Sequence, residues 1–373
     1  MKVNTLIVNT FKYFSVSLIT IFLTTFVFEI ILSRGKDRRE QQPHTIDRFI
    51  RLREHKININ KQYYANGKKN YKLSTDLNGY IKPSIIHNDN SINILFLGGS
   101  TTECLRMDEL KRFPYLVGRF LEEKTNLKIN SINSATSGNH SLHSINIFLN
   151  KGIWVPKKPQ LAVFMHNQND LTSLSYGKDY YSINTSRSII EINKRNKFDY
   201  SFFTFYIRKI FPNLSNKFTI VYDRLIKSND EWGSKRKEKI FIDKKNIKNQ
   251  FKSNLNTFIH IARSWGVDPV LMTQPNNYPL NKNQEVINNK FLVPFLKAQN
   301  LNYIEFKSLY DEFNETIRNV ANANNVTLID LEKMIQKDKK YFLDFIHVNE
   351  KGSNLVAREI SKKLVDKLIK TSK

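Results

Sequence analysis

Short apolar runs, rich in β-branched and aromatic residues, recur along the chain between longer segments of mixed polarity. Runs of this kind are typical of the inner strands of a parallel sheet, which are buried on both faces. The sequence predicts five such strands, over residues 92–97, 128–132, 161–165, 270–273 and 326–329.

The intervening segments carry apolar residues at helical spacing. The clearest stripe runs from Ile247 to Ala262 and ends near Gly266, and comparable stripes lie over residues 114–121, 142–149, 310–320 and 355–368. Because strands and helices alternate, the pattern predicts an α/β protein with three layers, in which helices cover both faces of a central parallel five-stranded sheet.

One connection, at about residues 171–245, is far longer than a normal link between a strand and a helix. It is rich in aromatic residues, among them Tyr176, Tyr180, Tyr181, Tyr200, Phe202, Phe203, Phe205 and Tyr206. We interpret it as a partly helical insertion that overhangs the carboxyl edge of the sheet.

Residues 14–32 form an apolar run whose single charged residue is Glu29. A helix over this run would be roughly 28 Å long, close to the thickness of a bilayer core. A cleaved signal peptide is the alternative, but no small-residue cleavage site follows the run. We therefore predict a membrane anchor over residues 1–36, a stalk and lead-in over 37–90, and the main folded domain over 91–373.

The orientation of this anchor is open. Basic residues are more frequent after the span, at Arg34, Lys36, Arg38 and Arg39, than before it, which favours a cytoplasmic domain. The chain holds 59 Lys and Arg against 34 Asp and Glu, a net charge of +25, so basic residues are common everywhere.

No arginine-rich stripe or nucleic-acid motif accompanies the charge, so we expect no nucleic-acid partner. A single cysteine, Cys104, excludes an internal disulfide.

Candidate chemistry lies where the predicted strands end. The first strand leads through Gly98 and Gly99 into Ser100, and open α/β sheets place their active residues at the carboxyl ends of strands. Near the end of the chain, Asp344 precedes His347 by three residues. A carboxylate at this spacing can orient the imidazole, which can then take the proton of a serine. Each motif alone is weak, and turn serines and surface Asp-x-x-His pairs are common.

Polar turns also follow the second and third strands, at residues 133–140 and 167–170. With these four blocks in order, the chain resembles the SGNH hydrolases, the esterase superfamily also called GDSL-like, in its membrane-anchored branch. The resemblance covers about residues 90–370 and implies a flavodoxin-like fold. It departs from the usual pattern at Gly99, where Asp is frequent, and at Asn167, where Gly is usual.

The resemblance also implies the roles of individual residues. Ser100 would be the nucleophile, with Asp344 and His347 completing the catalytic set. The backbone N–H groups of Ser100 and Gly138 and the side-chain amide of Asn169 would form the oxyanion hole. No cofactor is expected. His140, His143 and His166 are the residues that could suggest a metal, but no Cys or carboxylate cluster has matching spacing, so no metal site is predicted.

The expected function is therefore a serine ester hydrolase that forms an acyl-Ser100 intermediate and removes small acyl groups, such as acetyl, from a cell-envelope glycan. An O-acyltransferase, a lipase or thioesterase, and an inactive glycan-binding module stay open as alternatives. Membrane-anchored members of the resembled superfamily often act on envelope glycans. The resemblance therefore favours a catalytic domain in the periplasm or outside the cell, whereas the basic residues after the span favour the cytoplasm.

Overall fold

The computed structural model describes residues 2–33, 61–65, 69–76, 78–154, 157–181, 209–214, 242–289 and 292–371. These residues belong to two compact units. One contains helix α1 (Lys2–Ser33) and residues 209–214, and the other contains the remaining described residues.

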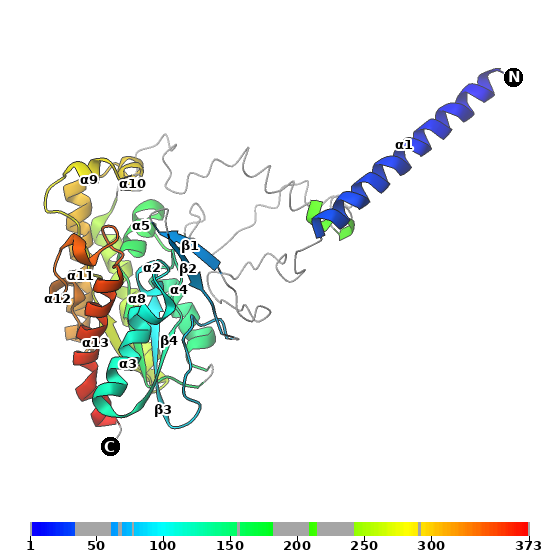
Figure 1. Ribbon diagram of the computed structural model, residues 1–373. Helices are drawn as coiled ribbons and strands as arrows, with labels where there is room; N and C mark the ends of the chain where they lie inside the picture. The colour runs from blue at the N-terminus through cyan, green and yellow to red at the C-terminus, as the bar shows by residue number, and fades with distance from the viewer. Residues whose placement is uncertain are drawn as a thin grey trace. The chain divides into compact units, whose positions relative to one another are not determined.

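A parallel sheet forms the centre of the larger unit (Figure 1). Its strands are β3 (Ser91–Gly98), β4 (Lys128–Asn133), β5 (Leu161–Met165), β6 (Asp268–Met272) and β7 (Thr327–Ile329). Their order is β4-β3-β5-β6-β7, which is the order of flavodoxin-like sheets. The predicted fold class and its five strands are confirmed.

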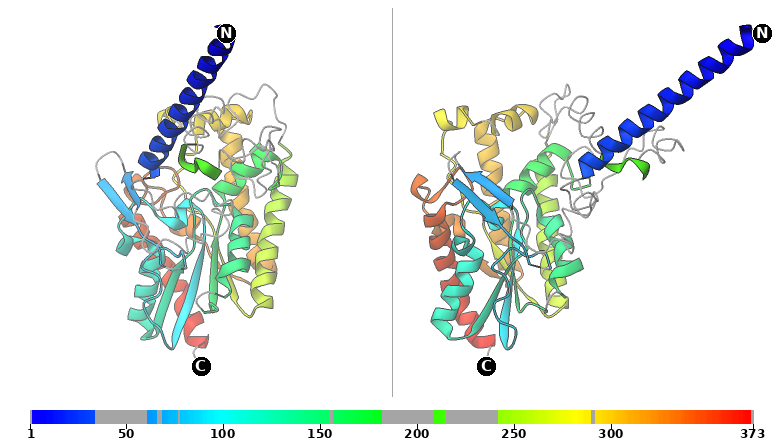
Figure 2. Two further views of the ribbon diagram at one scale, coloured as in Figure 1. Left: turned by 90° about the vertical axis from the view of Figure 1, so that its right-hand side faces the viewer. Right: turned by 45° about the vertical axis from the view of Figure 1, so that its right-hand side comes forward.

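Side chains of each strand alternate between two apolar cores, as a pleated strand requires. In β3, Leu95 and Leu97 enter one core while Ile94 and Phe96 enter the other. Figure 2 shows the two helical layers on either side of the sheet. This arrangement confirms the predicted three layers.

The first core is covered by α4 (Ser141–Ile147), α5 (Gln168–Gly177), α8 (Lys244–Ser264), α10 (Leu292–Ala298) and α11 (Tyr303–Ala323). The second core is covered by α3 (Phe113–Thr125) and α13 (Glu350–Thr371), which pack against each other. Short helices α2 (Ser100–Glu103), α9 (Gln284–Ile287) and α12 (Leu331–Met334) occupy loops.

Local sequence explains where the long helices begin. The Asp243 side chain accepts the N–H of Asn246 and caps α8, and Asn302 forms a reciprocal capping box with Glu305 at the start of α11. Gly266 adopts φ +64° just beyond α8, a conformation that ends helices and favours glycine.

The region predicted as a stalk contains an antiparallel hairpin, β1 (Lys61–Ala65) and β2 (Lys69–Leu73). Both strands have only five residues and combine Tyr, which favours strands, with Lys and Asn, which do not, so no hairpin was predicted there. Further along, Tyr80 and Ile81 are buried, and the Ile81 N–H donates to the Asn133 carbonyl at 2.9 Å. The lead-in is therefore part of the folded unit from at least this point, while the exact domain boundaries stay a prediction.

The insertion predicted at 171–245 is described only in part. Residues 171–177 belong to α5, and Tyr180 is buried with its hydroxyl 2.6 Å from Asp170 Oδ1. This beginning of the predicted insertion therefore packs into the domain. The aromatic residues at 200–206 lie outside the described residues.

Helix α1 contains the predicted anchor. Its segment Lys12–Ile31 has a mean hydropathy of 2.1 and is long and apolar enough to cross a membrane. Most side chains in this segment are exposed, Phe14 and Ile21 among them, whereas Glu29 is buried.

Candidate active site

The turn that follows β3 presents Ser100 at the start of α2. Backbone N–H groups of Thr102 and Glu103 both donate to the Gly99 carbonyl, at 3.1 and 2.9 Å, and so close the first turn of α2, which contains the serine. Gly99 itself has φ −96°, so glycine is not required by backbone conformation. It is required by space, because a Cβ at Gly99 would lie 2.4 Å from Asn169 Nδ2.

The loop before α13 brings the predicted Asp344 and His347 to this serine. His347 Nε2 lies 2.8 Å from Ser100 Oγ, and His347 Nδ1 lies 2.8 Å from Asp344 Oδ2. The backbone N–H of His347 also donates to Asp344 Oδ1 at 2.8 Å. A continuous chain of hydrogen bonds therefore runs from the hydroxyl through the imidazole to the carboxylate.

The electrostatic setting keeps this carboxylate ionised. Although partial burial opposes ionisation, the hydrogen bonds and charge of His347, with the N–H of Ile346, hold the pKa of Asp344 well below its usual range. Arg106 adds an ion pair, with Nη1 3.2 Å from Asp344 Oδ2. An ionised Asp344 can orient the imidazole and stabilise its protonated form.

The two further predicted donors lie on neighbouring loops. Gly138 has φ +81° in the turn after β4, a conformation that favours glycine. Asn169 lies in the first turn of α5, and its Nδ2 donates to the Asn139 carbonyl at 2.8 Å. This bond fixes the orientation of the amide. The departure at Asn167 is accommodated, because its side chain is buried and donates to the Tyr310 carbonyl at 2.9 Å.

A cavity of about 1040 Å³ joins these elements, and Ser100, Gly138, Asn169 and His347 all line it. Much of the remaining lining is apolar and includes Leu105, Met107, Tyr278, Leu292, Phe295 and Phe345. We call these six residues the apolar wall. No local pattern in the sequence predicts such a wall, because its members come from four separate parts of the chain.

Sequence reasoning also missed Gln274, which follows the end of β6. Its Nε2 donates to Thr101 Oγ1 at 2.9 Å, and its Oε1 accepts the N–H of Gln168 at 2.8 Å. This buried amide therefore ties the serine turn to the loop that holds Asn169. Its position at the carboxyl end of a predicted strand was the available signal.

Behind the site, the three histidines considered for a metal form part of a buried polar cluster. His166 Nε2 lies 2.8 Å from Ser144 Oγ, and burial lowers the pKa of His166 to about 3. The rings of His140 and His143 pack at 3.7 Å between centroids. Within the described part of the chain, no group of three or more His, Cys, Asp or Glu side chains could hold a metal ion.

Asp170, next to the predicted oxyanion donor, belongs to this cluster. It accepts the N–H of Ser141 at 2.9 Å and so caps α4, and burial raises its pKa to about 6 despite that bond and the one from Tyr180. Its role is to fix the relative positions of α4 and α5.

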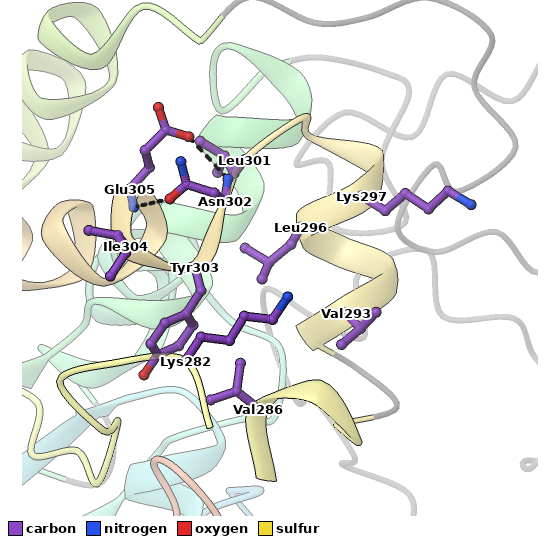
Figure 3. A pocket seen from close by; sticks show the side chains of 10 residues that line it. All are labelled: Lys282, Val286, Val293, Leu296, Lys297, Leu301, Asn302, Tyr303, Ile304 and Glu305. Carbon is purple, nitrogen blue, oxygen red and sulfur yellow. Dashed lines mark hydrogen bonds between the residues drawn. The ribbon is translucent and has the colours of Figure 1, made fainter. Parts of the chain in front are cut away.

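A second cavity, of about 440 Å³, lies where α9, α10 and the start of α11 meet (Figure 3). Lys282, Val286 and Leu296 enter it from different segments, and the Asn302–Glu305 capping box lies at its edge. None of Ser100, Gly138, Asn169 and His347 lines it.

No protein-family model matches the chain, and no curated protein sequence matches it. Among solved structures, the acetylxylan esterase Axe2 from Geobacillus stearothermophilus matches at 12% identity with a TM-score of 0.41, over 73% of this chain and 94% of Axe2. LAE5, an alpha/beta hydrolase enzyme from the metagenome of Lake Arreo, Spain, matches at 12% identity with a TM-score of 0.42, over 73% of this chain and 94% of its own.

Proposed function

We propose that this protein is a serine ester hydrolase that acts through an acyl-Ser100 intermediate. The observation that carries the proposal is the hydrogen-bonded series Ser100–His347–Asp344, which lines a cavity together with Gly138 and Asn169. Hydroxyl, imidazole and carboxylate in this order are the groups that nucleophilic ester cleavage needs.

In the proposed reaction, His347 Nε2 takes the proton of Ser100 as Oγ attacks the ester carbonyl. The N–H groups of Ser100 and Gly138 and the Asn169 amide stabilise the negative charge on the carbonyl oxygen. His347 then donates its proton to the leaving alcohol, which leaves the acyl group on Ser100. A water molecule, deprotonated by His347, releases the acid and restores the serine.

As substrate we propose a glycan of the cell envelope that carries small acyl groups such as acetyl. The open cavity, at about 1040 Å³, is large enough for a sugar residue beside the acyl group. The apolar wall favours a second candidate, an ester with a longer acyl chain, which would make the protein a lipase or thioesterase.

Acyl-chain preference separates these candidates. Full-length protein in detergent should hydrolyse p-nitrophenyl acetate with a higher kcat/KM than p-nitrophenyl octanoate if the natural acyl group is small. Burying six additional methylene groups against the apolar wall would favour octanoate by up to ~5 kcal/mol, a factor above ~10³.

A strong preference for octanoate would overturn the acetyl assignment and leave the Ser100 mechanism intact. Leu105→Ala serves as the matched variant, because Leu105 is a half-buried member of the apolar wall. It should reduce octanoate turnover selectively if the wall holds the acyl chain, and should affect both esters equally if it does not.

We also propose that α1 spans a membrane as a single pass and that the larger unit lies outside the cytoplasm. The length and hydropathy of Lys12–Ile31 support the span. Full-length protein should therefore remain in the membrane pellet after carbonate washing, whereas a chain beginning at Arg38 should be found in the soluble fraction. Release of the full-length protein by carbonate would contradict the anchor.

A further inference from the structure

Glu29 is an exception within α1. It lies two residues before the end of the apolar segment Lys12–Ile31, and it is only 8% exposed, while its neighbours Phe28 and Ile30 are 54% and 41% exposed. Another segment of the smaller unit therefore covers this carboxylate, while the side chains of Phe28 and Ile30 beside it stay exposed.

The cover comes from residues 209–214, which lie between α5 and α8 in the chain. Glu29 Oε1 accepts the backbone N–H and the side-chain amide of Asn213, both at 2.7 Å, and Oε2 accepts the N–H of Leu214 at 2.8 Å. Three donors on one buried carboxylate make this a specific contact, because hydrogen bonds to a charged acceptor are the stronger kind.

An aromatic contact extends the same interface along the helix. The ring of Phe211 packs edge-on against Phe22, with 5.7 Å between centroids, and Phe211 is 8% exposed. Phe22 precedes Glu29 by seven residues, roughly 10 Å along a helix axis. The segment therefore follows the last two turns of the apolar part of α1, and Ile210 keeps 49% of its surface exposed there.

A carboxylate within an apolar span is costly unless a polar partner satisfies it. For Glu29, the polar partners are the backbone N–H groups of Asn213 and Leu214 and the side-chain amide of Asn213. They lie at the end of the proposed span, where lipid would meet water. From these contacts we infer that residues 209–214 form a second membrane contact, in which Glu29 holds the segment at the lipid boundary and Ile210 faces the lipid. The inference rests on the proposal that α1 spans the membrane.

Fluorescence quenching by brominated lipids tests this in the full-length protein. The variant Ile210→Cys, labelled with an environment-sensitive maleimide fluorophore, should lose most of its emission in phosphatidylcholine vesicles whose acyl chains are brominated near the headgroup. Ile86→Cys is the matched control, because Ile86 in the larger unit is also 49% exposed, and its probe should keep its emission. Cys104 does not interfere, since it is buried and burial raises the pKa of its thiol to about 12.

A third probe, at Leu23→Cys on α1, separates the two proposals. Quenching at 23 without quenching at 210 would overturn the second contact and leave the anchor standing, whereas absence of quenching at 23 would overturn both. Glu29→Ala should release the segment, so the probe at 210 should regain emission while the probe at 23 stays quenched. Unchanged quenching at 210 in Glu29→Ala would show that Glu29 does not hold the segment.

Discussion

Replacing Ser100 with alanine should lower the hydrolysis of p-nitrophenyl acetate by at least about 10⁴-fold and abolish labelling by a fluorophosphonate probe. The hydroxyl is the group that would carry the acyl intermediate, so its loss leaves no nucleophile within reach of His347. The Tm should change little, because Ser100 Oγ makes its described contact with the imidazole alone.

The partner variants sharpen this result. His347→Ala should be as inactive as Ser100→Ala, and the double variant should be no worse than either, because the two side chains act as one unit. Asp344→Asn should lose activity by about 10⁴-fold, since an amide cannot hold the imidazole in the required tautomer. Ser308→Ala, on the exposed surface of α11, provides the control. Normal ester turnover by Ser100→Ala would refute the mechanism, and an unlabelled natural protein would favour a glycan-binding module.

Gly99→Ala should lower kcat by about 10²–10³-fold, the effect typical of losing one oxyanion donor. The added methyl would lie 2.4 Å from Asn169 Nδ2 and 3.0 Å from the Asn139 carbonyl, the two groups whose hydrogen bond orients the amide. Asn169→Ala should lower kcat by a similar factor. In the double variant, the fold loss in kcat should be smaller than the product of the two single losses, because both changes act on one donor.

A second glycine controls for simple crowding. Gly118→Ala, on α3, would bring a methyl within 3.0 Å of Ser131 Cβ, away from the cavity, so it should lower the Tm without changing kcat per folded molecule. An undiminished kcat in both Gly99→Ala and Asn169→Ala would remove Asn169 from the oxyanion hole.

The strand that leads to Ser100 was predictable because the run is short, mostly apolar on both faces and followed by two glycines, as is typical of an inner parallel strand. The glycine pair before Ser100 is visible in the sequence, but the group that excludes a Cβ at Gly99 is not. That group is the Asn169 amide, 70 positions later in the chain. Contacts of this kind depend on how loops meet, and no local pattern records them.

The apolar wall shows the same limit. Leu292 and Phe295 belong to a short helix with no long apolar stripe, and they reach the site only because α10 packs beside it. The aromatic residues that seemed better placed include Tyr180, which instead turns inward because its hydroxyl bonds to the buried Asp170. The catalytic roles of Ser100, Asp344, His347, Gly138 and Asn169 stay predictions, although the structure brings all five to one cavity.

The strand order has a consequence for how the site would fail under stress. Ser100 follows β3, which is paired on both sides, by β4 and β5. The loop that holds Asp344 and His347 comes after β7, an edge strand with three paired residues. Local opening costs least where pairing is sparse. The imidazole is therefore carried by chain that follows a sparsely paired edge strand, whereas the hydroxyl follows a strand paired on both sides. Under stress we expect the contact between His347 and Ser100 to be lost before β3 opens.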